Sequence, residues 1–546
     1  MITQGLSESS ESVDSSIQIR STVGRAGTSR SQMPNELEAK RPAHIITNQV
    51  NTALLASWTG ASSCAGEMTP SPPSTRPQPT PTRVYVRIRP ESESGGHASV
   101  ALAAANSNSI NAKEVKAHQK LTTKALHGWS DDSVTLSTQY TFSKGKACYN
   151  FPQRVLGPTT TQAQAYEEIN VASLVEEFTT FGGRNVMMFA YGQTGSGKTH
   201  TMFGTDESLR WCGGDDISNT CSTCQEDTAT KAENMEEGWG IFPRAFSQTI
   251  NILKGRDQPH MLSASAVEFY LGGCSDLLTQ EPNAVQIDPD TNEPINATTM
   301  EMKSMADLLR YLNLVQKNRT TRGTCMNDSS SRSHAALILT LQQIDADAKT
   351  CSQTTFTLVD LGGAERPTKT KEKRFTSTDM VLWDLSKGKE VPTGAQAYII
   401  NWELSMIATE IARATEAHRK KRPYAPPRQL ATDATRFLSS SFNGSALTCL
   451  CLCLSPANIN GWETWFSLKW GENVSKLEID VRGQRPQNIA KATKEAEKEV
   501  RIARKDLDGA SKNNRFYAKR KFRFDAASKK LSDLHAMTKM MGARSA

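Results

Sequence analysis

The sequence of 546 residues predicts an α/β domain with a central, mostly β sheet flanked by helices. Between about residues 81 and 480, apolar runs of strand length alternate with amphipathic stretches of helical length. A glycine-rich loop ending in Lys-Thr directly follows one of these apolar runs, as in phosphate-binding P-loop proteins. The segments on both sides are polar, so three regions are expected: an arm at 1–80, the domain at 81–480 and a tail at 481–546.

The elements follow one another in a regular order. The first expected strand is VYVRIR at 84–89, which Pro90 stops. The other apolar runs of strand length are 185–192, 262–270, 335–344, 355–363 and 446–454. The helical patterns are at 160–178, 305–318 and 403–421. Two polar stretches, roughly 205–236 and 367–395, are interpreted as insertions.

The N-terminal arm is rich in Ser, Thr, Pro and Gly and ends in TPSPPSTRPQPTPT, a composition that predicts disorder. Its start carries early acids and lacks a charged-then-apolar pattern, which argues against a secretory signal or a transit peptide. No run approaches the roughly 18–20 apolar residues that span a bilayer. We therefore expect a cytoplasmic protein without a membrane span.

The tail carries most of the net positive charge. The chain has a net charge of +7, but residues 482–546 alone carry +11 and the rest carries −4. Such a tail is either attracted to an acidic polymer or surface, or is simply a solvated lysine-rich helix. Heptad spacing with mostly small residues favours a short solvated helix over a dimeric coiled coil, but leaves a homodimer open. The heptad positions are Ile489, Thr493, Ala496, Val500, Ala503, Leu507 and Ala510.

Eleven cysteines without a secretion signal indicate a reducing compartment and mostly free thiols. Cys449, Cys451 and Cys453 alternate as one face of a buried strand. The group Cys212, Cys221 and Cys224 could bind zinc only with a fourth ligand nearby, so it is weak support for a metal site.

The segment GQTGSGKT fits the pattern G-x-x-x-x-G-K-[ST] and follows the apolar run NVMMFAY. Its glycines allow backbone N–H groups to close around phosphates, its lysine reaches the β and γ phosphates, and its threonine ligates Mg²⁺. The predicted nucleotide-binding residues of this loop are Gly192, Gln193, Thr194, Gly195, Ser196, Gly197, Lys198 and Thr199.

Detection of a γ-phosphate also needs hydroxyls, a carboxylate near Mg²⁺ and a mobile backbone N–H. Two downstream segments offer these groups: NDSSSRSH at 327–334 and LVDLGGAE at 358–365. Taken alone, the first could be a capped helix terminus and the second a tight turn.

Together these three segments resemble the kinesin motor domain. GQTGSGKTHTM matches the family's P-loop signature, NDSSSRSH its switch I pattern N-x-x-S-S-R-S-H, and DLGGAER its switch II pattern D-L-A-G-S-E-R. Weaker similarities are VYVRIRP, TTTQAQAYEE, GIFPRAF, VEFYLGGCSDLL, IINWEL in place of I-N-x-S-L, and FSLKWGENV. The resemblance spans about residues 83–480.

The resemblance implies a microtubule-stimulated ATP hydrolase that uses ATP and Mg²⁺ and is located on the microtubule cytoskeleton. It places Arg87 and Pro90 beside the adenine and His200 near its face. In switch I it places Asn327 and Ser330 near the γ-phosphate. No nucleic-acid partner is expected.

It further implies that Ser331, Asp360 and Thr199 support the metal or its waters. Arg332 would pair with Glu365 to close over the nucleotide, and the Gly363 N–H would sense the γ-phosphate. Hydrolysis would break this arrangement and pass the change to the microtubule-binding surface.

The sequence departs from the family pattern away from the nucleotide. Leu271 and Gly272 stand where the family has Asn-Glu, and PYAPPRQLAT replaces P-Y-R-D-S-K-L-T. The two inner prolines remove N–H donors from a segment that normally offers charge. Two basic clusters could compensate on acidic tubulin, or could be solvated loops. They are Lys369, Lys371, Lys373 and Arg374, and Arg419, Lys420, Lys421 and Arg422.

Two further functional hypotheses remain besides the motor. One is a non-motile microtubule-associated protein that uses the nucleotide as a structural switch. The other is a P-loop ATPase of this fold without a track. The altered PYAPPRQL segment and a weakly matching neck linker at 476–482 favour the former.

Overall fold

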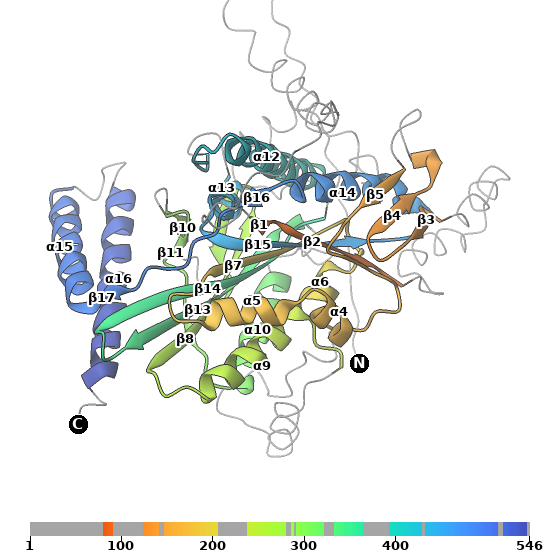
Figure 1. Cartoon of the computed structure of the whole chain (residues 1–546). Helices are drawn as coiled ribbons and strands as arrows, with labels where there is room; N and C mark the ends of the chain where they lie inside the picture. Colours follow the sequence, from red (N-terminus) through yellow and green to blue (C-terminus); the bar gives the residue numbers. More distant parts are fainter. Residues whose placement is uncertain are drawn as a thin grey trace, which may run out of the picture. The chain divides into compact units, whose positions relative to one another are not determined.

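The computed structural model describes residues 80–90, 124–140, 147–205, 237–279, 285–288, 291–321, 332–363, 393–427, 432–510 and 517–542. These residues build a mixed β-sheet with helices on both faces (Figure 1). Within this part of the chain, no helix combines the length and apolar character that crossing a membrane requires.

Ten strands of the described chain form the central sheet, in the order β12-β8-β13-β14-β7-β15-β2-β6, with β9 beside β8 and β17 beside β14. The strands from β14 to β6 pair in parallel, and the others pair antiparallel. The strands are β2 (Arg83–Ile88), β6 (Arg154–Leu156), β7 (Asn185–Tyr191), β8 (His260–Tyr270), β9 (Gly273–Asp276), β12 (Met300–Glu301), β13 (His334–Asp345), β14 (Thr350–Asp360), β15 (Ala446–Leu454) and β17 (Gln487–Asn488).

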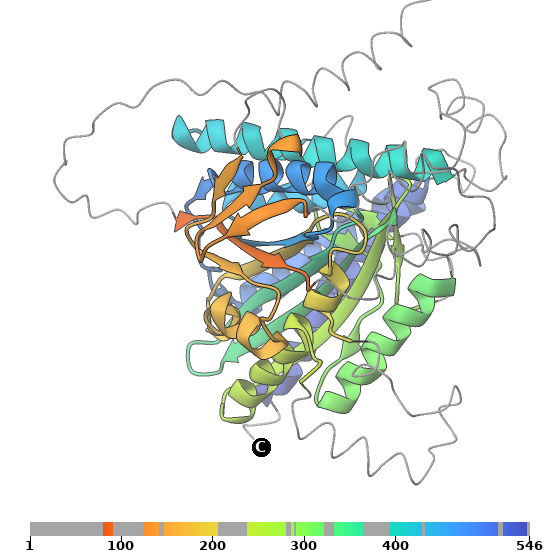
Figure 2. The same ribbon diagram turned by 90° about the vertical axis from the view of Figure 1, so that its right-hand side faces the viewer.

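Each face of the sheet has its own apolar core and its own set of helices (Figures 1 and 2). One face is covered by α4 (Gln162–Glu168), α5 (Val171–Thr179), α6 (Lys198–Met202), α9 (Ile241–Lys254) and α10 (Met305–Thr321). The other is covered by α12 (Thr393–Arg419), α13 (Asp433–Ser439) and α14 (Gly461–Val474). This layered arrangement confirms the predicted fold class.

The described residues also form three small sheets outside the central one. They are β3 (Leu126–Trp129) with β4 (Ser133–Leu136) and β5 (Cys148–Asn150), β10 (Gln286–Ile287) with β11 (Pro294–Ile295), and β1 (Thr80–Pro81) with β16 (Glu478–Ile479). Short 3₁₀ helices cover Thr138–Tyr140, Ser440–Asn443 and Asn458–Asn460.

The central strands are buried on both faces, as their continuous apolar runs predict. On β15, Cys449, Cys451 and Cys453 belong to one core, and the leucines that alternate with them, Leu450, Leu452 and Leu454, belong to the other. The predicted single helix over residues 160–178 is wrong, since it is divided into α4 and α5. Asn170 between them has a positive φ of 55°, a conformation that ends one helix and starts the next.

The tail packs against one end of β13 and β14 and contains two helices, α15 (Ile489–Asp508) and α16 (Tyr517–Gly542), which lie side by side. β16 pairs with β1, and β17 pairs with Thr350 and Cys351 of β14. The expected helical tail is thus confirmed, and most of α15 is exposed to solvent as expected, but one side of the helix is packed. Its heptad positions are buried or half-buried, because its small side chains allow close packing against α16 and the β13–β14 end.

Candidate functional site

The glycine-rich loop connects the carboxyl end of β7 to the first turn of α6. Gly192, Gly195 and Gly197 all have positive φ, which side chains rarely tolerate. At Gly192 a Cβ would lie only 2.2 Å from the Cys453 carbonyl oxygen, so this position also requires glycine for space. The predicted P-loop conformation therefore follows from its glycines.

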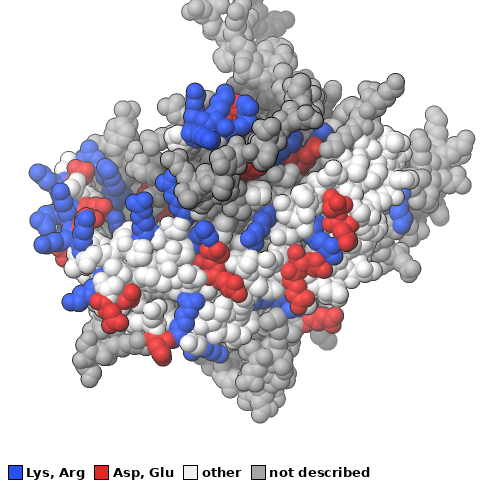
Figure 3. Space-filling model, in the orientation of Figure 1, with Lys and Arg blue, Asp and Glu red and all other residues white. Residues whose placement is uncertain are grey.

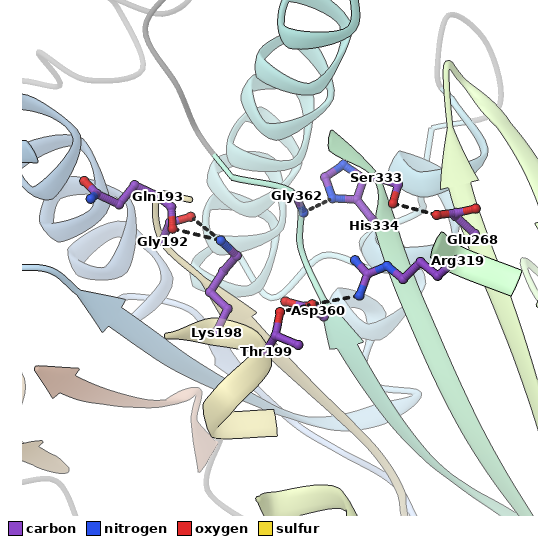
Figure 4. Close-up of polar contacts among 10 residues, drawn as sticks. All are labelled: Gly192, Gln193, Lys198, Thr199, Glu268, Arg319, Ser333, His334, Asp360 and Gly362. Carbon is purple, nitrogen blue, oxygen red and sulfur yellow. Dashed lines mark hydrogen bonds and ion pairs between the residues drawn. The ribbon is translucent and has the colours of Figure 1, made fainter. Parts of the chain in front are cut away.

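Lys198 begins α6 and its side chain folds back along the loop. Its Nζ donates to the carbonyl oxygens of Gly192 at 3.1 Å and Gln193 at 2.9 Å (Figure 4). Lys198 is only 7% exposed. A buried ammonium needs such acceptors, and they hold it inside the loop, where a phosphate would bind.

Three side-chain oxygens of the loop are buried without a hydrogen-bond partner in the described structure: Gln193 Oε1, Thr194 Oγ1 and Ser196 Oγ. Buried polar atoms are normally satisfied, so unsatisfied ones gathered in one loop indicate a polar ligand. The loop thus fits an anionic, hydrogen-bonding ligand such as a polyphosphate with its metal.

Asp360, at the end of β14, lies beside the loop. Thr199 Oγ1 donates to Asp360 Oδ2 at 2.9 Å, and Arg319 Nη1 lies 3.0 Å from the same oxygen (Figure 4). The second oxygen, Oδ1, is buried and has no hydrogen-bond partner among the described residues. A hydroxyl and a carboxylate in contact at this place are the donor set that Mg²⁺ prefers.

Sequence reasoning missed Arg319, which comes from the last turn of α10. A buried aspartate requires a counter-charge, and this was the signal that could have prompted a search for a nearby cation. Arg319 is well placed for it, because α10 ends just before the switch I-like segment.

The described parts of the two switch-like segments lie next to Asp360. Gly362 donates its backbone N–H to His334 Nδ1 at 2.8 Å, and Ser333 Oγ donates to Glu268 Oε1 at 2.7 Å (Figure 4). Gly363 packs so closely on the P-loop that a Cβ there would lie 2.2 Å from Thr194 Oγ1. The structure thus brings Gly363 to the phosphate loop, as the resemblance implies for a phosphate sensor.

Arg332 points to α12. Its Nη1 donates to Gln396 Oε1 at 3.2 Å. Its expected partner, Glu365, lies outside the described residues, as do Asn327, Ser330 and Ser331.

The other side of the loop opens into a cavity of about 390 Å³. Arg87, Pro90 and His200, the residues expected beside an adenine, all line it. Arg87 is held by Gln162 and Thr201, with Arg87 Nη1 lying 2.7 Å from Gln162 Oε1. The structure therefore gathers these three residues around one space.

Arg89 also lines this cavity, and sequence reasoning missed it; its Nη1 donates to the Gly195 carbonyl oxygen. Burial lowers the pKa of His200, and the charges of Arg87 and Arg89 lower it further. A neutral imidazole next to two guanidinium groups suits a flat, polar, uncharged ring.

Of the predicted microtubule contacts, the structure describes the cluster Arg419 to Arg422 at the end of α12. Arg419 and Lys420 both pair with Glu416, at 2.9 and 2.8 Å. These contacts lower the pKa of Glu416 to about 2, the hydrogen bond from Arg419 contributing most. Figure 3 shows positive charge gathered at this end of α12 and over α15 and α16. The other cluster, Lys369, Lys371, Lys373 and Arg374, lies outside the described residues, as do Cys212, Cys221 and Cys224.

Comparisons with known proteins agree with this arrangement. The kinesin motor domain profile matches residues 87–477. Kinesin-like protein KIN-14P of Oryza sativa subsp. japonica is 29% identical over 366 residues, which are 66% of this chain and 31% of the relative. The kinesin heavy chain of Doryteuthis pealeii is 26% identical over 374 residues, 67% of this chain and 32% of the relative. The chain thus spans about a third of the length of these curated relatives.

A solved structure of a fast kinesin, described with its ATPase mechanism and microtubule interactions, superposes with a TM-score of 0.52 at 20% identity. The match covers 74% of this chain and 94% of that one, and it supports the fold. Since the family profile covers most of the chain, from the first central strand to the helix after β15, the chain belongs to the kinesin motor domain family.

Proposed function

We propose that this chain is a microtubule-stimulated ATP hydrolase that couples hydrolysis to microtubule binding and movement. The observation that carries the proposal is the contact between Thr199 Oγ1 and Asp360 Oδ2 beside the buried Lys198. P-loop hydrolases need a lysine, a hydroxyl and a carboxylate at this place, and kinesin motor domains are nucleotide-binding.

ATP and Mg²⁺ are the ligands that fit best. Thr199 and Asp360 would hold the metal, which supplies charge neutralisation on the β and γ phosphates when bound. Lys198 would exchange its loop carbonyl acceptors for phosphate oxygens. The unsatisfied Thr194 Oγ1 and Ser196 Oγ offer further hydrogen-bonding groups to the same ligand.

The protein's own groups would then position the reaction. Gly363 lies against Thr194, so its N–H is close to where a γ-phosphate would end. Arg332 would leave Gln396 for Glu365 as the site closes. This exchange would move α12, because Gln396 lies in the first turn of that helix.

The microtubule surface is proposed along α12 and its basic end. The exposed cluster Arg419 to Arg422 suits acidic tubulin, and its contribution would be screened by salt. Microtubules in the cytoplasm are accordingly the proposed location. A homodimer through α15 would require α15 and α16 to separate, because the heptad seam is already packed in this chain.

A second function, a nucleotide-dependent structural switch without movement, is favoured by one observation. Pro426 and Pro427 follow Tyr424 close to the end of α12, where they limit hydrogen bonding to a partner. Tyr424 itself is fixed to α12, since its hydroxyl donates to Glu410 Oε2 at 2.7 Å.

The test is the Mg²⁺-dependent ATPase rate of the full chain with and without microtubules at low salt. Strong stimulation is the expected result. Hydrolysis without stimulation would remove the microtubule part of the proposal. Nucleotide binding without any hydrolysis would replace it by the structural switch.

A further inference from the structure

Glu403 is an unusual residue for its place on α12. It is 1% exposed, and its neighbours Ile400 and Leu404 belong to the apolar core under the helix. A carboxylate in such a place is strongly destabilising unless it has a partner. The identity of that partner indicates what Glu403 does.

The partner is His334, which is fully buried. His334 Nε2 lies 3.3 Å from Glu403 Oε2, while Nδ1 accepts the backbone N–H of Gly362 at 2.8 Å. A ring nitrogen that accepts a hydrogen bond cannot carry a proton, so the proton of the neutral ring is on Nε2, the nitrogen nearer to the carboxylate. Neither Nε2 nor Glu403 Oε1 has a well-aligned hydrogen bond within the described residues.

The contacts of His334 with Glu403 and Gly362 connect three elements next to the candidate site. His334 is the first residue of β13, and it contacts Gly362, which follows the end of β14 (Figure 4). Glu403 lies on α12. Gly362 lies between Asp360, the candidate metal ligand, and Gly363, which packs on Thr194 of the P-loop. The Gly362 amide therefore fixes the backbone that carries both groups.

We propose that Glu403 is a positioning residue for this site. Its Oε2 lies 3.3 Å from His334 Nε2, and the carboxylate charge favours a proton on that nitrogen, which keeps Nδ1 free to accept the Gly362 N–H. A displacement of α12 weakens the first contact and thereby loosens the second, so the helix position is transmitted to residues 360–363. Its consequence for catalysis rests on the proposed function, whereas the linkage itself does not.

The first test uses hydrogen exchange at the Gly362 amide in the full chain. Glu403→Met keeps the side-chain volume but removes the acceptor, and should speed exchange about tenfold, the loss of one hydrogen bond. Glu403→Gln keeps an acceptor oxygen and should restore near-normal protection. Glu410→Met is the matched control, because Glu410 is also a buried carboxylate of α12 but pairs with Arg413 and Tyr424.

Unchanged exchange in Glu403→Met would overturn the proposal, and so would an equal increase in Glu410→Met, which would indicate general loosening of α12. His334→Asn provides a second check, since its side-chain oxygen can accept from Gly362 but cannot reach Glu403. In that background Glu403→Met should have no further effect. A further tenfold increase would show that the link does not pass through His334.

A third test reads the tautomer of His334 in the unsubstituted chain. The imidazole ¹⁵N shifts of His334, assigned with His334→Asn, should show protonated Nε2 and unprotonated Nδ1. A proton on Nδ1 would overturn the proposal.

The catalytic consequence is read separately. Glu403→Met should lower the microtubule-stimulated kcat about fivefold or more, leave the half-saturating microtubule concentration unchanged, and be rescued by Glu403→Gln. If microtubules do not stimulate the ATPase of the unsubstituted chain, the proposed function is wrong. The hydrogen-exchange and tautomer measurements still test whether Glu403 acts on Gly362 through His334. A change in the half-saturating concentration alone would place Glu403 in microtubule binding and overturn its positioning role.

Discussion

Arg319 and Asp360 form an ion pair in the interior, with Nη1 and Oδ2 3.0 Å apart and side chains 8% and 2% exposed. Removal of one partner from such a pair leaves an uncompensated charge, so Arg319→Met should lower the unfolding free energy by about 3–5 kcal/mol. Mg²⁺ with nucleotide should recover part of this loss, since the metal would take over the carboxylate. Urea unfolding with and without the ligand measures both effects.

The matched control is Arg154→Met, which breaks the half-exposed pairs with Asp131 and Glu168. Exposed pairs contribute less than about 1 kcal/mol. Equal losses in the two variants would contradict a special role for the Arg319 contact.

Lys198→Ala should weaken binding of a fluorescent ATP analogue by more than about tenfold, because charged hydrogen bonds to the phosphates are lost. Lys254→Ala, at the exposed end of α9, serves as the control. Full ATPase activity in Lys198→Ala would reject the assignment of this loop as the phosphate site.

The basic end of α12 allows changes in both directions. Alanine at all four positions from Arg419 to Arg422 should weaken co-sedimentation with microtubules but leave basal hydrolysis intact. Glu416→Gln should strengthen co-sedimentation at low salt, because it frees Arg419 and Lys420 from their shared carboxylate. Unchanged binding in both variants would remove this patch from the microtubule surface.

The turn between β8 and β9 carries a strained residue. Leu271 and Gly272 both have positive φ, 52° and 83°, as in the type I′ turns that favour Asn-Gly. Leu271→Asn should therefore raise the unfolding free energy by about 1 kcal/mol in chemical denaturation. Leu271→Ala keeps the positive φ of a non-glycine residue and should not stabilise the protein. Stabilisation by both variants would show that loss of the leucine side chain, and not relief of backbone strain, is the cause.

The packing of the tail can be tested at Ala496, which is fully buried among Ile344, Leu534 and Met537. Ala496→Glu should detach α15 and α16 and speed proteolysis within 489–546, because a carboxylate cannot be buried there without a partner. Ile502→Glu on the same helix should have little effect, since Ile502 is 54% exposed. Equal protease resistance of Ala496→Glu and the unsubstituted chain would contradict the packed tail.

Local sequence patterns were sufficient for the sheet and the phosphate loop. The strands β7, β13, β14 and β15 were predicted correctly because each is a continuous apolar run. The P-loop was predicted because its glycines and lysine are close together in the sequence. Contacts between elements that are distant in the sequence could not be predicted from these local patterns.

Arg319, Arg89 and Glu403 illustrate that limit. Each is an ordinary charged residue in its local sequence and becomes informative only when the fold places it against Asp360, Gly195 or His334. The heptad spacing of α15 favoured a solvated helix, and it could not show that one side packs against α16 and the end of β13 and β14.

The attachment of the tail to β14 has a mechanical consequence. β17 is hydrogen-bonded to Thr350 and Cys351 at one end of this strand, and Asp360 is at the other. The strand has 11 residues, so the two ends are about 35 Å apart. A pulling force on the tail is therefore transmitted to the end of β13 and β14, and the far end of β14 carries the candidate metal ligand.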